Sequence, residues 1–206
     1  NAQSRSIEEA FLHYGVPYKI VGGQRFYDRK EIKDIMAYLR FIFQPADRIS
    51  FERIVNVPTR GIGTKSLQKF YEYQTENNYT LLQTLGQASS IAVPTKAISG
   101  FLQLADIVTT NQSIMENAAV NGIIDSLIRR IDYMDFLSDG TPAGEAKQEN
   151  VKELLSVASE YSEMGLGGFL EEVSLVADID QADFGNNSVT LMTLHAAKGL
   201  EFPVVF

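Results

Sequence analysis

Apolar residues recur at helical spacing over most of the 206-residue chain, which predicts a mainly α-helical protein. A helix expected from Asp28 to about Phe43 carries apolar residues at Ile32, Ile35, Met36, Leu39 and Phe43. Glycine, proline and asparagine breakers bound further expected helices over residues 49–55, 64–77, 80–87, 96–118, 122–137, 145–164 and 168–177. The connections between them are short, so neighbouring helices are expected to pack antiparallel.

Strand-like patterns occur near both ends of the chain and predict an α/β arrangement there. A short helix over 6–14 and a strand over 16–21 are expected first. A strand over 189–194, a small polar loop and a second apolar strand over 202–206 are expected last. We therefore expect a helical domain, residues 27–184, inserted into a partial α/β domain formed by residues 1–26 and 185–206.

The chain begins without methionine and stops within an apolar run, and an open apolar strand is an adhesive edge. We therefore expect a fragment of a longer protein. Its two terminal segments are expected to pair either with each other or with a second copy of the chain.

The charge is distributed unevenly, although the net charge of −8 alone argues against a nucleic-acid binder. Residues 1–70 hold 12 of the 18 basic and 7 of the 26 acidic residues, a balance of +5, whereas residues 71–206 carry −13. This asymmetry suggests a surface for a polyanion, unless the two halves of the sequence do not correspond to separate surfaces. The chain has no cysteine, signal peptide or apolar run long enough to span a bilayer, so we expect a cytoplasmic protein without a membrane partner.

A glycine turn, Gly61-Ile-Gly63, directly precedes the helix expected from Thr64. The turn leaves the backbone unshielded, and a helix N-terminus presents free N–H groups that favour phosphate. Three cations surround it, and two of them, Lys65 and Lys69, share a helix face. The pattern predicts a contact with DNA backbone phosphates, against the alternative of an ordinary turn between helices. The candidate residues are Arg60, Gly61, Ile62, Gly63, Thr64, Lys65 and Lys69.

A second basic group is expected on the helix from Asp28, where Arg29, Lys33 and Arg40 fall on one face. Such a face is either solvated or in contact with DNA. The spacing alone does not decide between them.

The chain lacks the usual signatures of a complete enzyme. It has no glycine-rich phosphate loop followed by lysine and serine or threonine, no clustered metal ligands and only two histidines. His13 lies in a short expected helix, where a surface or packing role is the ordinary outcome. We therefore predict no catalytic residue and no metal site in this chain.

Four blocks in order resemble the superfamily 1 DNA helicases of the UvrD/Rep/PcrA type. They are Asn1–Arg5, Gly22–Asp34, Asn56–Gly63 and Thr193–Phe202, the last reading T-L-H-A-A-K-G-L-E-F. The resemblance implies a RecA-like second motor domain in two pieces with a helical domain inserted between them. It also implies an ATP-dependent enzyme that moves along single-stranded DNA and unwinds duplex DNA in repair or replication.

The same resemblance assigns roles by position. Thr193 and His195 would contact single-stranded DNA, Gly199 and Glu201 would contact the nucleotide, and the turn at Gly61 would touch duplex DNA. Lys198 would face phosphate or a neighbouring acid, or it would form a structural salt bridge. ATP and Mg²⁺ would be cofactors of the whole protein and would not remain on this chain, whose isolated form is expected to lack ATPase activity.

The partners expected from the resemblance are single-stranded and duplex DNA, the other motor domain of the same protein, and repair or replication proteins. One competing interpretation is a helical protein-interaction module whose basic first third is incidental. Another, a self-contained nucleotide-binding protein, is disfavoured because the phosphate loop is absent from the sequence.

Overall fold

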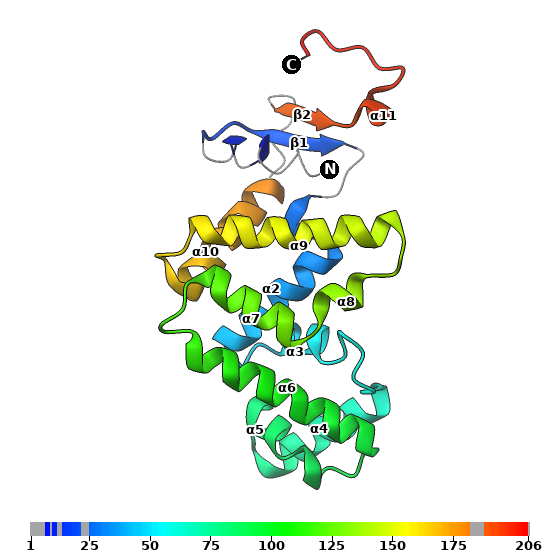
Figure 1. Cartoon of the computed structure of the whole chain (residues 1–206), viewed down its shortest axis with the longest axis vertical. Helices are drawn as coiled ribbons and strands as arrows, with labels where there is room; N and C mark the ends of the chain where they lie inside the picture. The colour runs from blue at the N-terminus through cyan, green and yellow to red at the C-terminus, as the bar shows by residue number, and fades with distance from the viewer. Residues whose placement is uncertain (1–6, 9, 12–13, 22–24, 182–187, 206) are drawn as a thin grey trace. The chain divides into compact units, whose positions relative to one another are not determined.

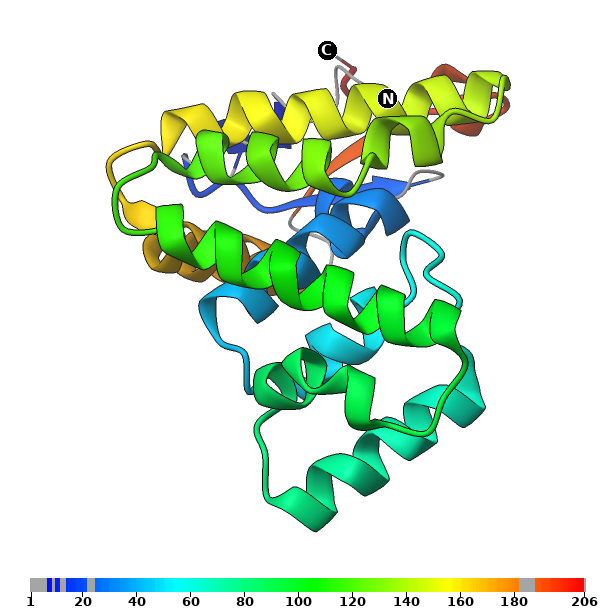
Figure 2. The same ribbon diagram turned by 60° about the horizontal axis from the view of Figure 1, so that its bottom comes forward.

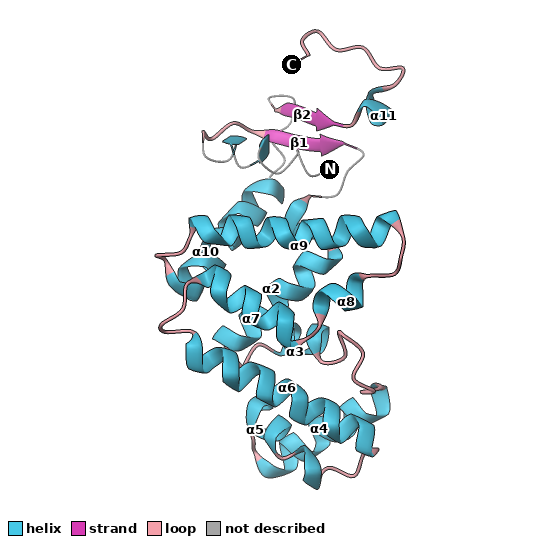
Figure 3. Cartoon of the chain, in the orientation of Figure 1, coloured by secondary structure: helices cyan, strands magenta, loops and turns pink. Residues whose placement is uncertain are grey.

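The computed structural model describes residues 7–8, 10–11, 14–21, 25–181 and 188–205, with only the backbone given for 176–181 and 195. It divides the chain into two compact units, one formed by residues 1–29 and 171–206 and the other by residues 30–170. These limits differ from the expected boundaries at residues 27 and 184. Helices dominate the chain (Figure 3), in agreement with the mainly α composition expected from the sequence.

The terminal unit contains two short parallel strands, β1 (Tyr18–Val21) and β2 (Val189–Met192), drawn as arrows in Figure 1. Tyr18 pairs with Val189 and Val21 with Met192. Parallel strands need a long connection, which here is the rest of the chain between them. Of the two expected pairings, the terminal segments therefore pair with each other.

Two sequence expectations for the terminal unit are corrected by the structure. The polar loop expected after β2 begins as a one-turn helix, α11 (Leu194–Ala197). Residues 202–205, expected as a strand, are exposed and have no strand conformation. Apolar character alone does not make a strand without a neighbour to pair with. Near the other end, residues 7–8 and 10–11 are helical, and the chain turns at Gly15, whose φ is +63°.

The centre of the helical unit is α2 (Lys30–Phe43), which contacts α3 (Arg48–Ile54), α6 (Thr95–Ile114), α7 (Val120–Arg130) and α9 (Pro142–Glu160). Because helices cover it on several sides, α2 buries far more than the expected single stripe, including Tyr38, Phe41 and Ile42. Phe43, expected inside, is 50% exposed. The expected basic face is also wrong at Arg29, which is buried with its guanidinium over the Phe26 ring.

The remaining elements follow the expected helices closely, with one exception. The helix expected over residues 122–137 is two helices, because Asp132 has a φ of +48° that ends regular helix. No helix among the described residues is long and apolar enough to cross a membrane. The other elements are η1 (Phe26–Asp28), α4 (Thr64–Asn77), α5 (Leu81–Gly86), η2 (Ala88–Ser90), α8 (Tyr133–Leu137) and α10 (Gly165–Gln181).

A row of four phenylalanine rings joins α2, α3, α4 and α6. The ring centroids lie 5.4 Å apart for Phe41 and Phe51, 5.3 Å for Phe51 and Phe70, and 4.8 Å for Phe70 and Phe101. All four side chains are fully buried. Rings at these separations contribute packing energy beyond their buried area. The row fixes α4 and α6 against the centre of the unit.

A buried polar cluster lies nearer the N-terminus of α2, around Glu31 and Asp34. The Asp34 carboxylate pairs with the Arg53 guanidinium at 2.8 Å and accepts a hydrogen bond of 3.1 Å from the Tyr133 hydroxyl. The neighbouring Glu31 carboxylate accepts from Asn150 Nδ2 at 2.6 Å. Burial of Tyr133, followed by the nearby Asp34 charge, raises the pKa of its hydroxyl. The cluster satisfies the buried charges of α2 and connects it to α3, α8 and α9.

Candidate nucleic-acid interface

The loop between α3 and α4 is shaped by hydrogen bonds from its own side chains. Asn56 Oδ1 accepts from the backbone N–H of Arg60 at 2.8 Å and from that of Ile62 at 3.2 Å. Ile62 is buried at 4% exposure. The loop is therefore folded around Asn56, with Ile62 anchored in the interior and the two flanking glycines nearer the surface.

Gly61 adopts a left-handed backbone conformation, with a φ of +75°. A methyl group at this position would lie 2.6 Å from Cγ of Lys96, whose aliphatic stem therefore crosses the glycine. Figure 2 shows the cyan loop before α4 beside the N-terminal end of α6, the helix that carries Lys96. The tight backbone at Gly61 is thus covered on one side by the stem of an exposed lysine.

Helix α4 begins immediately after Gly63, its N-cap, with no side chain capping its first turn. The first backbone hydrogen bond of this turn runs from Leu67 N–H to Gly63 O at 3.0 Å. The amides of Thr64, Lys65 and Ser66 have no acceptor among the described residues. Free amides and the helix dipole together favour an anion at this end. Gly63, Thr64 and Lys65 are all exposed.

Three exposed lysines lie around this helix end: Lys65 and Lys69 on α4, and Lys96 on α6. The ammonium of Lys69 donates to the carbonyl of Ala92 at 2.6 Å and so ties α4 to the segment before α6. Sequence reasoning missed Lys96, because 35 positions separate it from Gly61 and no local pattern links them. The Pro94-Thr-Lys96 helix start was visible in the sequence, but its place beside the turn comes from the fold.

The structure corrects the expected role of Arg60. Its side chain is buried at 6% exposure, and its guanidinium donates to the carbonyls of Ile54 and Val57 at 3.0 and 3.1 Å. It also donates to the hydroxyl of Tyr38. A guanidinium used in this way is not available to a DNA phosphate. Arg60 is therefore not one of the exposed cations around the helix start.

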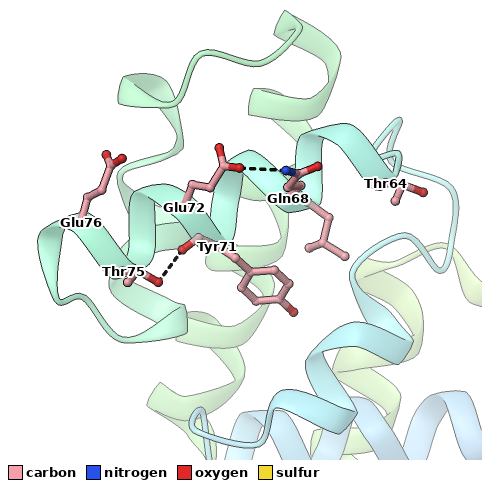
Figure 4. Close-up of a pocket in the computed structure, with 7 residues that line it drawn as sticks. Thr64, Gln68, Tyr71, Glu72, Thr75 and Glu76 are labelled. Carbon is pink, nitrogen blue, oxygen red and sulfur yellow. Dashed lines mark hydrogen bonds between the residues drawn. The ribbon is translucent and has the colours of Figure 1, made fainter.

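The remaining length of α4 carries acidic side chains instead of lysines (Figure 4). Its outer face forms a shallow pocket lined by Thr64, Leu67, Gln68, Tyr71, Glu72, Thr75 and Glu76. Gln68 Nε2 donates to the carboxylate of Glu72 at 2.9 Å, and Glu76 lies one turn further on. These carboxylates would repel a DNA backbone. A phosphate contact is therefore confined to the first two turns of the helix.

The candidate residues of the terminal unit run from Thr193, just before α11, to Glu201 after it. The Thr193 hydroxyl accepts from Ala196 N–H at 3.2 Å and so caps this single turn. The side chain of His195 lies outside the described residues. Gly199 has a φ of +84°, and Gly199 and Glu201 are exposed, as is Lys198. The structure thus brings Thr193, Gly199 and Glu201 onto one short exposed segment.

Neither segment forms a metal site in the described part of the chain, where no group of three His, Asp or Glu side chains is placed to hold an ion.

Comparison with known proteins gives the family. Residues 1–206 match the UvrD-like helicase C-terminal domain. The chain is 42% identical over 213 residues to the ATP-dependent DNA helicase PcrA of Staphylococcus aureus strain Mu50, and 41% identical to that of Staphylococcus epidermidis strain RP62A. In both cases the match covers 100% of this chain and 29% of the relative's length. The chain therefore belongs to the UvrD-like helicase C-terminal domain family.

Proposed function

We propose that this chain is part of an ATP-dependent DNA helicase, in which residues 30–170 provide a contact with the backbone of duplex DNA. The observation that carries the proposal is the uncapped start of α4 behind the Gly61–Gly63 turn, with the lysines of α4 and α6 around it. The family membership and the similarity to the PcrA helicases of Staphylococcus also support it. The proposed contacts are Gly61, Gly63, Thr64, Lys65, Lys69 and Lys96.

Such a contact suits a protein that must act on any sequence. Backbone phosphates fix position without carrying sequence information, and amides and ammonium groups recognise them equally along any duplex. Because the carboxylates of Glu72 and Glu76 follow on the same helix, the contact would be short. We propose an interaction of a few phosphates rather than a long groove.

The terminal unit supplies the second part of the proposal. Thr193 and His195 would contact single-stranded DNA, and Gly199 and Glu201 would contact ATP. Most of the contacts to ATP and Mg²⁺ would come from other parts of the larger protein. We propose a cytoplasmic enzyme whose partners are single-stranded and duplex DNA and its own other motor domain. The chain alone should then show no ATP hydrolysis. DNA-stimulated ATP hydrolysis by the purified chain, absent from a control preparation made without it, would contradict this.

The proposal is tested by titrating the chain with a fluorescent DNA duplex at several salt concentrations. If the three lysines neutralise about three phosphates, the logarithm of the association constant should fall against the logarithm of salt with a slope of about −2.7. A single-stranded oligonucleotide of the same length separates duplex contact from general attraction to DNA. No binding at low salt would contradict the proposal and favour a protein-interaction module instead.

The surface of α4 also supports the second candidate, a protein-interaction module. The pocket on α4 combines the apolar groups of Leu67 and Tyr71 with two exposed carboxylates. These features fit a protein surface better than a nucleic acid. If the duplex titration fails, this face is the place to seek a protein contact.

A further inference from the structure

A buried arginine at the centre of the α3–α4 loop bonds only neutral groups, and its Nε has no hydrogen-bond partner among the described residues. The Arg60 guanidinium reaches the carbonyls of Ile54 and Val57 and a third carbonyl, that of Pro58, at 3.3 Å. Among the described residues no carboxylate pairs with it. Burying a cation that bonds only carbonyls and a hydroxyl costs free energy. This cost suggests that the geometry of the arginine serves another purpose.

Tyr38 connects this arginine to the central helix. Its hydroxyl accepts from Arg60 Nη2 and donates to the Val57 carbonyl at 2.6 Å. The side chain is fully buried on α2, 22 positions before Arg60. One hydroxyl therefore contacts both Val57 and Arg60 and ties this part of the loop to α2, the central helix of the unit.

Asn56 completes the arrangement on the other side of the loop. Its side-chain oxygen accepts from the amides of Arg60 and Ile62, which flank Gly61. The amide of Gly61 lies between these two bonded amides and has no acceptor among the described residues. The bonds formed by Asn56 therefore fix the backbone on both sides of the exposed turn.

We propose that Tyr38, Asn56 and Arg60 are positioning residues that hold the Gly61–Gly63 turn and the start of α4 in the shape that receives a phosphate, without touching DNA themselves. This inference rests on the proposed duplex contact and deepens it. A preformed turn avoids the entropic cost of ordering a loop on binding. The buried charge of Arg60 also adds positive potential beneath the turn.

The test uses two matched tyrosine variants of the full 206-residue chain. Tyr38→Phe removes the hydroxyl that holds the loop. Tyr133→Phe is the control, because Tyr133 is equally buried and its hydroxyl bonds Asp34 and the Glu31 carbonyl in the polar cluster instead. Both variants lose one buried phenol hydroxyl, so their thermal midpoints should fall by similar amounts.

Duplex titration across salt then separates the two. We expect Tyr38→Phe to weaken binding by about threefold to tenfold, the effect of a buried hydrogen bond, with an unchanged salt slope because every cation remains. Tyr133→Phe should bind as the unaltered chain does. Equal affinities for Tyr38→Phe and the unaltered chain, both folded by circular dichroism, would overturn the inference.

Two further variants keep the outcomes distinct. Lys65→Ala should weaken binding and make the slope shallower by about 0.9, because it removes one phosphate contact. If the unaltered chain binds and Lys65→Ala weakens it while Tyr38→Phe does not, the inference fails and the proposed function stands. If Tyr38→Phe does not fold, Asn56→Ala takes its place, since Asn56 is only partly buried. Unchanged duplex affinity in that variant would equally overturn the inference.

Discussion

At the scale of single residues, the loop before α4 and the first turn of that helix show two basic residues in opposite roles. Arg60 and Lys65 are five positions apart, yet the first is buried and bonded to carbonyls while the second is exposed at a helix start. The sequence places both in one basic cluster. Only the fold separates the cation that shapes the turn from the cation that can meet an anion.

Gly63 provides a prediction in which stability and binding change in opposite directions. It is an exposed N-cap with open space around it and an extended backbone that suits serine. In Gly63→Ser, the hydroxyl should accept from a first-turn amide and stabilise the chain by a few tenths of a kcal/mol, about the difference between these two caps. Because that amide is then taken, duplex affinity should fall. Urea unfolding and duplex titration measure the two effects.

The matched control caps a different helix. Ala119 is the exposed N-cap of α7 and also lacks a side-chain cap. Ala119→Ser should stabilise the chain by about 1 kcal/mol and leave duplex affinity unchanged. A Gly63→Ser variant that is stabilised but binds duplex as strongly as before would show that the α4 amides do not meet phosphate.

Two tyrosines give a prediction for alkaline pH. Burial raises the pKa of Tyr38 to about 12, although Arg60 opposes the shift; burial, followed by the hydrogen bond with Glu52, raises that of Tyr71 to about 12. A raised pKa means that the folded chain keeps protons that the unfolded chain loses. The resulting stability is complete below about pH 10 and is lost as pH rises towards 12. The free energy of unfolding in urea should therefore fall between pH 9 and 11, and a flat profile would contradict the assigned shifts.

At the scale of elements, helix periodicity and breakers were sufficient to locate most helices. The bounds of α4, Thr64–Asn77, match the expectation, because a glycine turn begins it and Asn78 ends it with a left-handed φ of +52°. Periodicity could not foresee that α2 would be covered on several sides, nor that Asp132 would divide α7 from α8. Both depend on tertiary packing or on one unusual backbone angle rather than on local pattern.

The same limit applies to the candidate site. The turn, the helix start, Lys65 and Lys69 could be proposed from adjacent residues, and an Asn before a turn is a known backbone acceptor. Lys96 could not, because α6 reaches the turn through Gly100. A methyl group on Gly100 would lie 2.6 Å from the Arg60 carbonyl oxygen and 2.8 Å from Arg60 Cβ. The approach of these two elements is therefore decided by a glycine in the middle of a helix.

This close approach makes Gly100 sensitive to substitution. Gly100→Ala should destabilise the chain by about 1 to 3 kcal/mol, the range for overpacking a close contact, because the added methyl meets backbone that cannot move aside easily. The expected control is Gly122→Ala on α7, where nothing lies within 4 Å of the added methyl. That variant should be stabilised by about 0.5 to 1 kcal/mol. Urea unfolding of both variants checks the pair, and equal effects would contradict the packing described for α6.

At the scale of the whole molecule, the charge asymmetry seen in the sequence becomes more specific. The first 70 residues carry a balance of +5, but several of their cations are engaged within the fold: Arg60 is buried in the loop and Arg53 pairs with Asp34. The cations that surround the proposed contact include Lys96, which lies in the acidic remainder of the chain. Charge counted along the sequence therefore does not identify which cations surround the proposed contact.

We propose that the start of α4 and the three lysines around it hold the backbone of duplex DNA. A direct test compares the salt dependence of duplex binding for the unaltered chain and a variant in which Lys65, Lys69 and Lys96 are all alanine. Lys152→Ala, an exposed lysine on α9, serves as the control. We expect a slope of about −2.7 for the unaltered chain and the control, and a slope close to zero for the triple variant. Identical slopes for the triple variant and the unaltered chain would contradict this phosphate contact.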